Sequence, residues 1–241
     1  MVEETRRMGG ERVAMDERQA VSALRWWLET GVDVATQECP RNWLEQPAKV
    51  ASTPSPAVPV SEPPLESLEG FRDWLSSSLD APLASAGARA VRPQGTEGSE
   101  VMLLSEAPTR DEIAAGLPIG GDAAVLMERM LAAIGLAGQA YSANLACFHS
   151  PGARLSDQQL EACAAAARQH IALARPKRLL LLGDVPSRAL LGKRLLEARG
   201  HVHKIEGVRT VATFHPRQLL RRPSDKALAW RDLLLLIEET P

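Results

Sequence analysis

The stretch Lys177-Arg-Leu-Leu-Leu-Leu-Gly183 places four consecutive leucines directly before a glycine. A strand that is apolar at every position is typical of a parallel sheet with helices on both of its faces. Gly183 is a natural end for such a strand, and Pro186 suits the first turn of a helix. We therefore expect a buried strand over residues 177–182 and a helix over residues 186–199.

The same alternation of strand and helix extends to both sides of this segment. Short apolar runs predict further strands at 101–104, 140–146 and 208–214, and apolar periodicity predicts helices at 122–134, 156–174 and 224–239. Strand–helix units with short connections imply right-handed crossovers and a parallel sheet. The sequence therefore predicts an α/β fold, a three-layer αβα arrangement on a four-stranded parallel sheet, with its core in residues 98–240.

The first part of the chain has a different character. Asp16 and Gly31 delimit an amphipathic helix over residues 16–31, and residues 46–64 contain six prolines. Such a Pro- and Ser-rich stretch is typical of an extended linker. A short helix is expected over residues 65–79. We predict a helical extension (1–45), a linker (46–64) and an α/β domain (65–241).

The composition excludes several classes of protein. The chain has 241 residues, of which 45% are hydrophobic and 24% are charged, as in ordinary soluble domains. No apolar run approaches the ~20 residues of a membrane helix, and the N-terminus lacks the apolar core of a signal peptide. Three cysteines, an odd number, argue against a disulfide framework. A cytoplasmic protein without membrane association is expected.

Charge is distributed unevenly along the chain. Residues 1–99 carry 15 acidic and 10 basic side chains, whereas residues 193–231 carry 10 basic and 3 acidic ones. The basic C-terminal region suits either a polyanionic partner or an ordinary solvated surface.

Polar residues follow each predicted strand. In open parallel sheets, ligands bind beyond the carboxyl ends of the strands, so these positions are candidates for a site. An acidic side chain, an amide and an imidazole are expected to surround one cavity there, contributed by Glu106, Asn144 and His215.

Three segments resemble the family 4, iron–sulfur branch of the uracil-DNA glycosylase superfamily. The family's first motif, Gly-Glu-Ala-Pro-Gly-x-x-Glu-Asp-x-x-Gly-x-Pro-Phe-Val-Gly, is matched at Glu106, Ala107, Pro108, Glu112, Gly116 and Pro118. Its second motif is similar to Ala143-Asn-Leu-Ala-Cys-Phe-His-Ser-Pro-Gly-Ala-Arg154. Its last, His-Pro-Ser-x-Leu-Leu-Arg-x-Pro, is similar to His215-Pro-Arg-Gln-Leu-Leu-Arg-Arg-Pro223. The resemblance spans about residues 101–235.

This resemblance implies a monomeric DNA-repair enzyme that hydrolyses the N-glycosidic bond of a flipped-out uracil in single- or double-stranded DNA. Glu106 would position or deprotonate the attacking water, and His215 would donate to the departing base. Asn144 would read uracil N3–H and O4 with its amide. The resemblance also implies base contacts from Pro118 and Ile119, and phosphate contacts from Arg154, Arg217, Arg221 and Arg222.

The chain departs from the family pattern at several positions. Ser105 and Thr109 replace two glycines, and Ile119 replaces the aromatic residue that would stack on the base. Cys147 and Cys163 keep the separation of the second pair of cluster ligands, but no cysteine lies near residues 81–84, where the first pair would fall. Because a [4Fe–4S] cluster normally takes four thiolates, we predict no cofactor or metal and regard the two cysteines as vestigial ligands.

Two alternatives stay open. The altered first motif and the missing cysteine pair also fit a catalytically weakened relative that binds DNA or a repair partner without cleaving. A doubly wound domain for a small phosphate ligand is less favoured, because Ser105-Glu-Ala-Pro108 offers a carboxylate where amide donors are needed.

Overall fold

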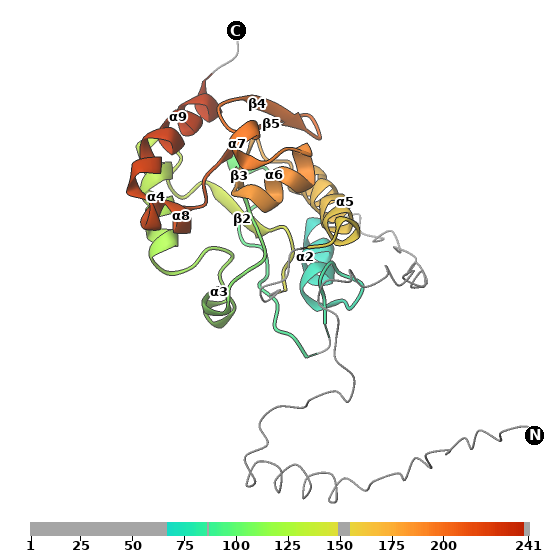
Figure 1. Ribbon diagram of the computed structural model, residues 1–241. Helices are drawn as coiled ribbons and strands as arrows, with labels where there is room; N and C mark the ends of the chain where they lie inside the picture. The colour runs from blue at the N-terminus through green and yellow to red at the C-terminus, as the bar shows by residue number, and fades with distance from the viewer. Residues whose placement is uncertain (1–66, 86, 149–154, 239–241) are drawn as a thin grey trace, which may run out of the picture. The chain divides into compact units, whose positions relative to one another are not determined.

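A five-stranded sheet forms the centre of the computed structural model (Figure 1). The structure describes residues 67–85, 87–148 and 155–238, so the predicted helix at 16–31, the linker, Cys39 and Arg154 lie outside it. The strand order is β2-β1-β3-β5-β4. The strands are β1 (Val101–Ser105), β2 (Ala140–Asn144), β3 (Arg178–Leu182), β4 (Val202–Ile205) and β5 (Val208–Thr213).

The parallel strands β2, β1, β3 and β5 are the four that the sequence predicts, and the αβα fold class is confirmed. The strand count differs, because β4 pairs antiparallel with β5 at the edge of the sheet. Glu206 and Gly207 turn the chain between β4 and β5, both with positive φ. Strand β4 is mostly exposed and polar, so no buried apolar pattern marks it in the sequence.

Helices cover both faces of the sheet (Figure 1). One face carries α4 (Gly121–Ala133) and α9 (Lys226–Ile237), and the other carries α5 (Asp157–Ala174), α6 (Asp184–Leu191) and α7 (Leu195–Ala198). The helix expected over 186–199 is therefore two helices, because Gly192 takes a left-handed conformation and ends α6. In the described ranges no helix is both long and apolar enough to cross a membrane.

Four further helical segments lie outside these two layers. Helix α2 (Leu68–Ser77) packs against α5, while α3 (Arg110–Ala115), α8 (Pro216–Arg221) and the 3-10 turn Pro223–Asp225 lie in the connections that follow β1 and β5. Helices α3 and α8 are too short to show apolar periodicity, and the sequence does not predict them.

Alternation along the strands determines which residues reach the site. Leu103, Leu180 and Val211 pack in the core beneath α4 and α9. Because side chains of a strand alternate between faces, Ser105 lies on the same face, one step beyond Leu103. Asn144 is its register partner on β2. The carboxyl edge of the sheet beneath α4 and α9 therefore presents both polar side chains.

A buried polar chain fastens α2 to the sheet. Arg72 Nε donates to the hydroxyl of Tyr141 at 2.9 Å, and this hydroxyl lies 2.6 Å from Nε2 of His170. Since the arginine is only a donor, the tyrosine hydroxyl passes its own hydrogen to His170. Burial, with a smaller effect of Arg72, lowers the pKa of His170 to about 3, so this imidazole is neutral.

Candidate active site

His215 stands at the start of α8, directly after β5. Its Nδ1 accepts the backbone N–H of Arg217 at 3.1 Å and so caps the helix. Burial, and then the nearby Arg217 charge, lowers the pKa of His215 to about 3. A neutral imidazole with an accepting Nδ1 carries its hydrogen on Nε2. That Nε2–H therefore donates to Ser105 Oγ, 3.0 Å away.

Asn144 ties the loops of the site together. Its Nδ2 donates to the carbonyl oxygens of Glu106 at 2.9 Å and of Pro118 at 3.0 Å. The reverse orientation of the amide would set its oxygen against two carbonyls, so these partners fix the assignment. Both amide hydrogens are used, whereas the buried Oδ1 has no partner among the described residues. Asn144 is thus left with an acceptor alone, and not with the donor and acceptor that the resemblance implies.

Arg217 joins the two carboxylates of the first motif. Its Nη2 donates to Glu106 Oε1 and its Nη1 to Glu112 Oε2, each at 2.7 Å. Glu112 is buried and also accepts from Thr109 N, Thr109 Oγ1 and Gly120 N. Glu106 is more open, with a side chain 42% exposed. In this structure the guanidinium of Arg217 is therefore occupied by carboxylates rather than turned to a phosphate.

Pro118 and Ile119 line a cleft of about 620 Å³. Glu106, Asn144 and His215 do not line this cleft, so a cavity shared by the three side chains stays a prediction. The cleft lies between α4, the edge strand β2 and Gln94, which pairs with Ser142. Ile119 packs with Leu103 and other residues of the core beneath α4. The structure thus brings Glu106, Asn144 and His215 together, with Pro118 joined through its carbonyl, and places Ile119 in the adjoining core.

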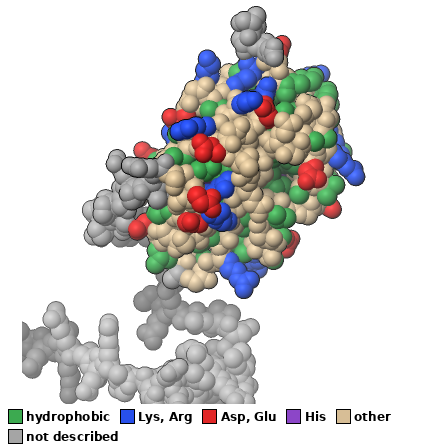
Figure 2. All heavy atoms as spheres, turned by 180° about the vertical axis from the view of Figure 1, so that it is seen from behind, with side chains coloured by type: hydrophobic (Ala, Val, Ile, Leu, Met, Phe, Trp, Pro, Cys, Tyr) green, Lys and Arg blue, Asp and Glu red, His purple; other side chains and the backbone are tan. Residues whose placement is uncertain are grey.

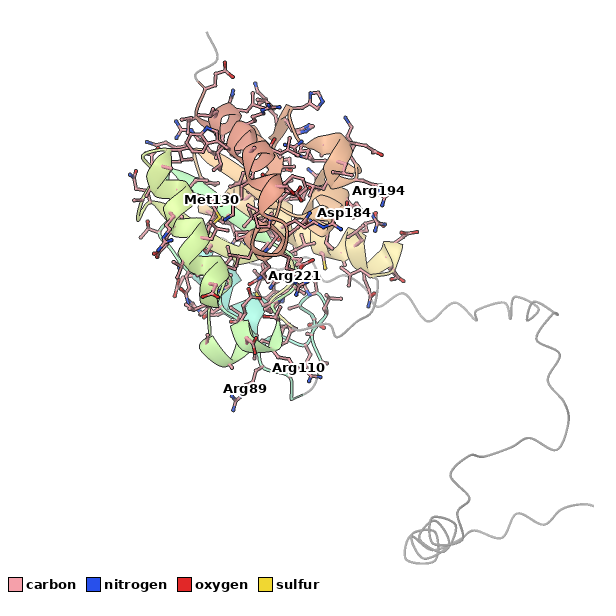
Figure 3. The ribbon with its side chains drawn as sticks, turned by 60° about the vertical axis from the view of Figure 1, so that its left-hand side comes forward. Arg89, Arg110, Met130, Asp184, Arg194 and Arg221 are labelled. Carbon is pink, nitrogen blue, oxygen red and sulfur yellow. The ribbon has the colours of Figure 1, made fainter. Side chains whose placement is uncertain are left out.

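Exposed arginines are the candidates for phosphate contacts. Arg221 and Arg222 are exposed at the end of α8 and form no ion pair with another described residue. Figure 3 marks the position of Arg221. Arg110, at the start of α3, and Arg89 extend outward in the same view. On the face seen in Figure 2, basic side chains are interspersed with acidic and apolar ones. Phosphate contacts from Arg221 and Arg222 stay a prediction.

Replacing Arg217 with glutamine is expected to lower the free energy of unfolding by about 1.5–3 kcal/mol, since a buried carboxylate loses its charged partner but keeps three other donors. The midpoint of urea unfolding measures this loss. Arg221→Gln, on the same helix but exposed, is the matched control and is expected to change stability little. Equal effects of the two changes would show that the bridge to Glu106 and Glu112 does not stabilise the fold.

The two described cysteines do not fit an iron–sulfur cluster. Cys147 packs with Phe71, Phe148 and Ala81, and Cys163 packs in the core on the α5 face of the sheet. Burial raises the pKa of each thiol to about 12, and these two cysteines are the only ones in the described ranges, whereas a cluster normally takes four thiolates. No group of three or more His, Cys, Asp or Glu residues that could hold a metal occurs in the described ranges. We therefore derive no step through a cluster.

A three-layer α/β domain with an imidazole, an amide and a carboxylate at the carboxyl edge of its sheet is the architecture that the resemblance implies. The family model of the uracil DNA glycosylase superfamily matches residues 92–234, more than half of the chain, and the chain belongs to that superfamily.

Two curated relatives carry the narrower name Type-4 uracil-DNA glycosylase. The protein of Pyrobaculum aerophilum is 27% identical over 180 residues, which cover 70% of this chain and 92% of the relative. The protein of Archaeoglobus fulgidus is 28% identical over 171 residues, which cover 66% of this chain and 86% of the relative. The resemblance to the family 4 branch is confirmed.

Sequence reasoning missed the structural roles of three site residues. Thr109 and Glu112 form a capping box at the start of α3. The spacing Thr-x-x-Glu is the sequence signal that predicts such a box. No comparable signal exists for the contact between Ser105 and His215, because the two residues are 110 positions apart. Only the packing of β1 near β5 brings them together.

Proposed function

We propose that this protein hydrolyses the N-glycosidic bond of uracil in DNA. The observation that carries the proposal is the convergence of His215, Asn144 and Glu106, from three separate segments, at one edge of the sheet. Membership of the superfamily and the names of the two relatives support it. DNA is the proposed partner; a monomeric state and a cytoplasmic location stay predictions.

The chemistry assigns a role to each group. When the bond between C1′ and the base breaks, its electron pair passes to uracil, and water adds to the sugar. A neutral imidazole that carries a hydrogen-bond donor stabilises the anionic base. The pKa of His215, about 3, keeps this imidazole neutral at neutral pH. Glu106 has an exposed carboxylate that can orient the water and accept its proton. Asn144 Oδ1 accepts from the base N3–H.

A uracil-release assay on a labelled oligonucleotide tests the proposal. His215→Ala is expected to lower kcat by about 10²–10³, the usual cost of a lost donor to a developing anion. His215→Asn, which keeps an acceptor for capping α8, guards against a trivial loss of folding. His201→Ala is the control, because His201 is exposed and its ring lies against His203 rather than against a site residue. Release that survives both His215 changes would contradict the assignment.

A second function, DNA binding without cleavage, is favoured by one observation. Ser105 is fully buried, and Asn144 and His215 are only 3% and 5% exposed, so a base reaches them only if covering groups shift. Fluorescence anisotropy with uracil-containing DNA distinguishes the two functions. Salt-sensitive binding together with no release would support the binding protein and contradict the enzyme.

A further inference from the structure

Two of the family-pattern departures lie directly against residues of the proposed site. Ser105, where the family pattern has glycine, receives the Nε2–H of His215 at 3.0 Å. Arg217, where that pattern has serine, holds Glu106 at 2.7 Å. A glycine at position 105 would leave the imidazole hydrogen free for a substrate. In this chain a hydroxyl stands at that hydrogen.

The hydroxyl of Ser105 still has a hydrogen to give. Its oxygen accepts from His215, and no acceptor for its own hydrogen is recorded among the described residues. A hydroxyl that accepts from one group can donate to another, and such chains of hydrogen bonds strengthen one another in a low-dielectric interior. Ser105 can therefore accept a hydrogen bond from His215 and donate its own hydrogen to a third group.

Asn144, the register partner of Ser105, has the opposite requirement. Its Oδ1 is a buried acceptor without a partner in the described part of the chain. An unsatisfied buried polar atom costs about 1–3 kcal/mol, so it needs an explanation, and a ligand that donates a hydrogen bond would remove this cost. The neighbouring strand ends thus offer one donor and one acceptor.

A donor beside an acceptor matches a carbonyl beside an N–H. Uracil has this pair in its N3–H and either flanking carbonyl. Cytosine placed in the same register does not match, because its N3 is itself an acceptor and would oppose Asn144 Oδ1. The orientation fixed by Glu106 O and Pro118 O leaves Asn144 no donor for a second carbonyl.

We propose that Ser105 is the residue that contacts the base in this chain, donating to a uracil carbonyl while it accepts from His215, with Asn144 Oδ1 on the adjacent N3–H. This rests on the proposed function and assigns the direct contact to serine rather than to histidine. No bond to Ser105 forms and no proton leaves it. The hydrogen bond strengthens as charge develops on the base.

Titration of the full-length ¹⁵N-labelled protein with free uracil tests the contact without catalysis. The imidazole Nε2–H signal of His215 reports on the relay. Ser105→Ala is expected to weaken uracil binding by about tenfold or more. Ser99→Ala, a buried serine beyond the opposite end of β1, is the control and is expected to bind uracil normally.

A double-mutant cycle on uracil release distinguishes a relay from a merely structural serine. If the two residues act as a relay, adding His215→Ala to Ser105→Ala lowers the rate of uracil release by less than about a further twofold, because the hydrogen-bond path to the base is already broken. If they act independently, their losses of activation free energy add. If Ser105→Ala binds uracil as tightly as the unchanged protein or more tightly, or if the unchanged protein binds none, the inference is wrong. Uracil binding without release would instead contradict the proposed function and leave the Ser105 contact standing.

Discussion

Replacing Asp232 with alanine is expected to lower the free energy of unfolding by about 3–5 kcal/mol. Asp232 is fully buried on α9 and accepts from Arg199 Nη2 at 3.1 Å, from Thr213 Oγ1 at 2.9 Å and from Gly200 N at 3.1 Å. Burial raises the pKa of this carboxyl, and Arg199 and Thr213 oppose the rise. Alanine would leave the guanidinium, largely buried, without its partner.

The loss would also reach the proposed site, because Thr213 is the last residue of β5 and stands two positions before His215. Urea unfolding measures the stability, and uracil release measures the effect on the site. Asp73→Ala is the matched control: its ion pair with Arg92 is exposed, and such pairs contribute about 0–1 kcal/mol. Similar losses for Asp73→Ala and Asp232→Ala would show that burial of the Asp232 pair has no special weight.

The second large effect is a loss of stability in mild acid. His170 and His215 are both buried, and both have a pKa lowered from 6.5 to about 3. Below pH 6.5 the unfolded chain binds protons that the folded chain excludes. Their contribution is therefore complete above pH 6.5 and is lost as the pH falls toward 3, by about 1.4 kcal/mol per pH unit for each histidine.

Urea unfolding at intervals from pH 7 to pH 5 measures this slope before most carboxylates titrate. His170→Gln keeps an acceptor for the Tyr141 hydroxyl but cannot be protonated there, so it is expected to halve the slope. His201→Gln, at an exposed position, is expected to leave it unchanged. A slope that is the same in all three proteins would mean that His170 is not the group that titrates.

Much of the fold could be predicted from local pattern. The leucines before Gly183 form the buried strand β3, and the Ser156-Asp-Gln-Gln159 capping box begins α5. Both follow from interactions within a few residues of each other, which the sequence displays directly. Strand β4 escaped prediction because an exposed edge strand imposes no apolar alternation on its residues.

The candidate site could be predicted only in outline. The positions of Glu106, Asn144 and His215 after three strands predicted their convergence, because parallel strands end at one edge. The sequence did not reveal that Arg217 has two carboxylate partners in the folded chain. It also did not reveal that both amide hydrogens of Asn144 are used by carbonyl oxygens. Such contacts depend on distances of tenths of an ångström between remote segments.

The sequence alone determined the class of fold and the identity of the polar groups at the carboxyl edge, because periodicity and motif spacing are properties of neighbouring residues. The tertiary structure decided which partner each donor takes. The imidazole of His215 donates to Ser105, the amide of Asn144 donates to two carbonyl oxygens, and the guanidinium of Arg217 donates to two carboxylates. Hydrogen bonding saturates, since each donor serves few acceptors, and the assignment is fixed only once the folded chain has placed all competing partners together.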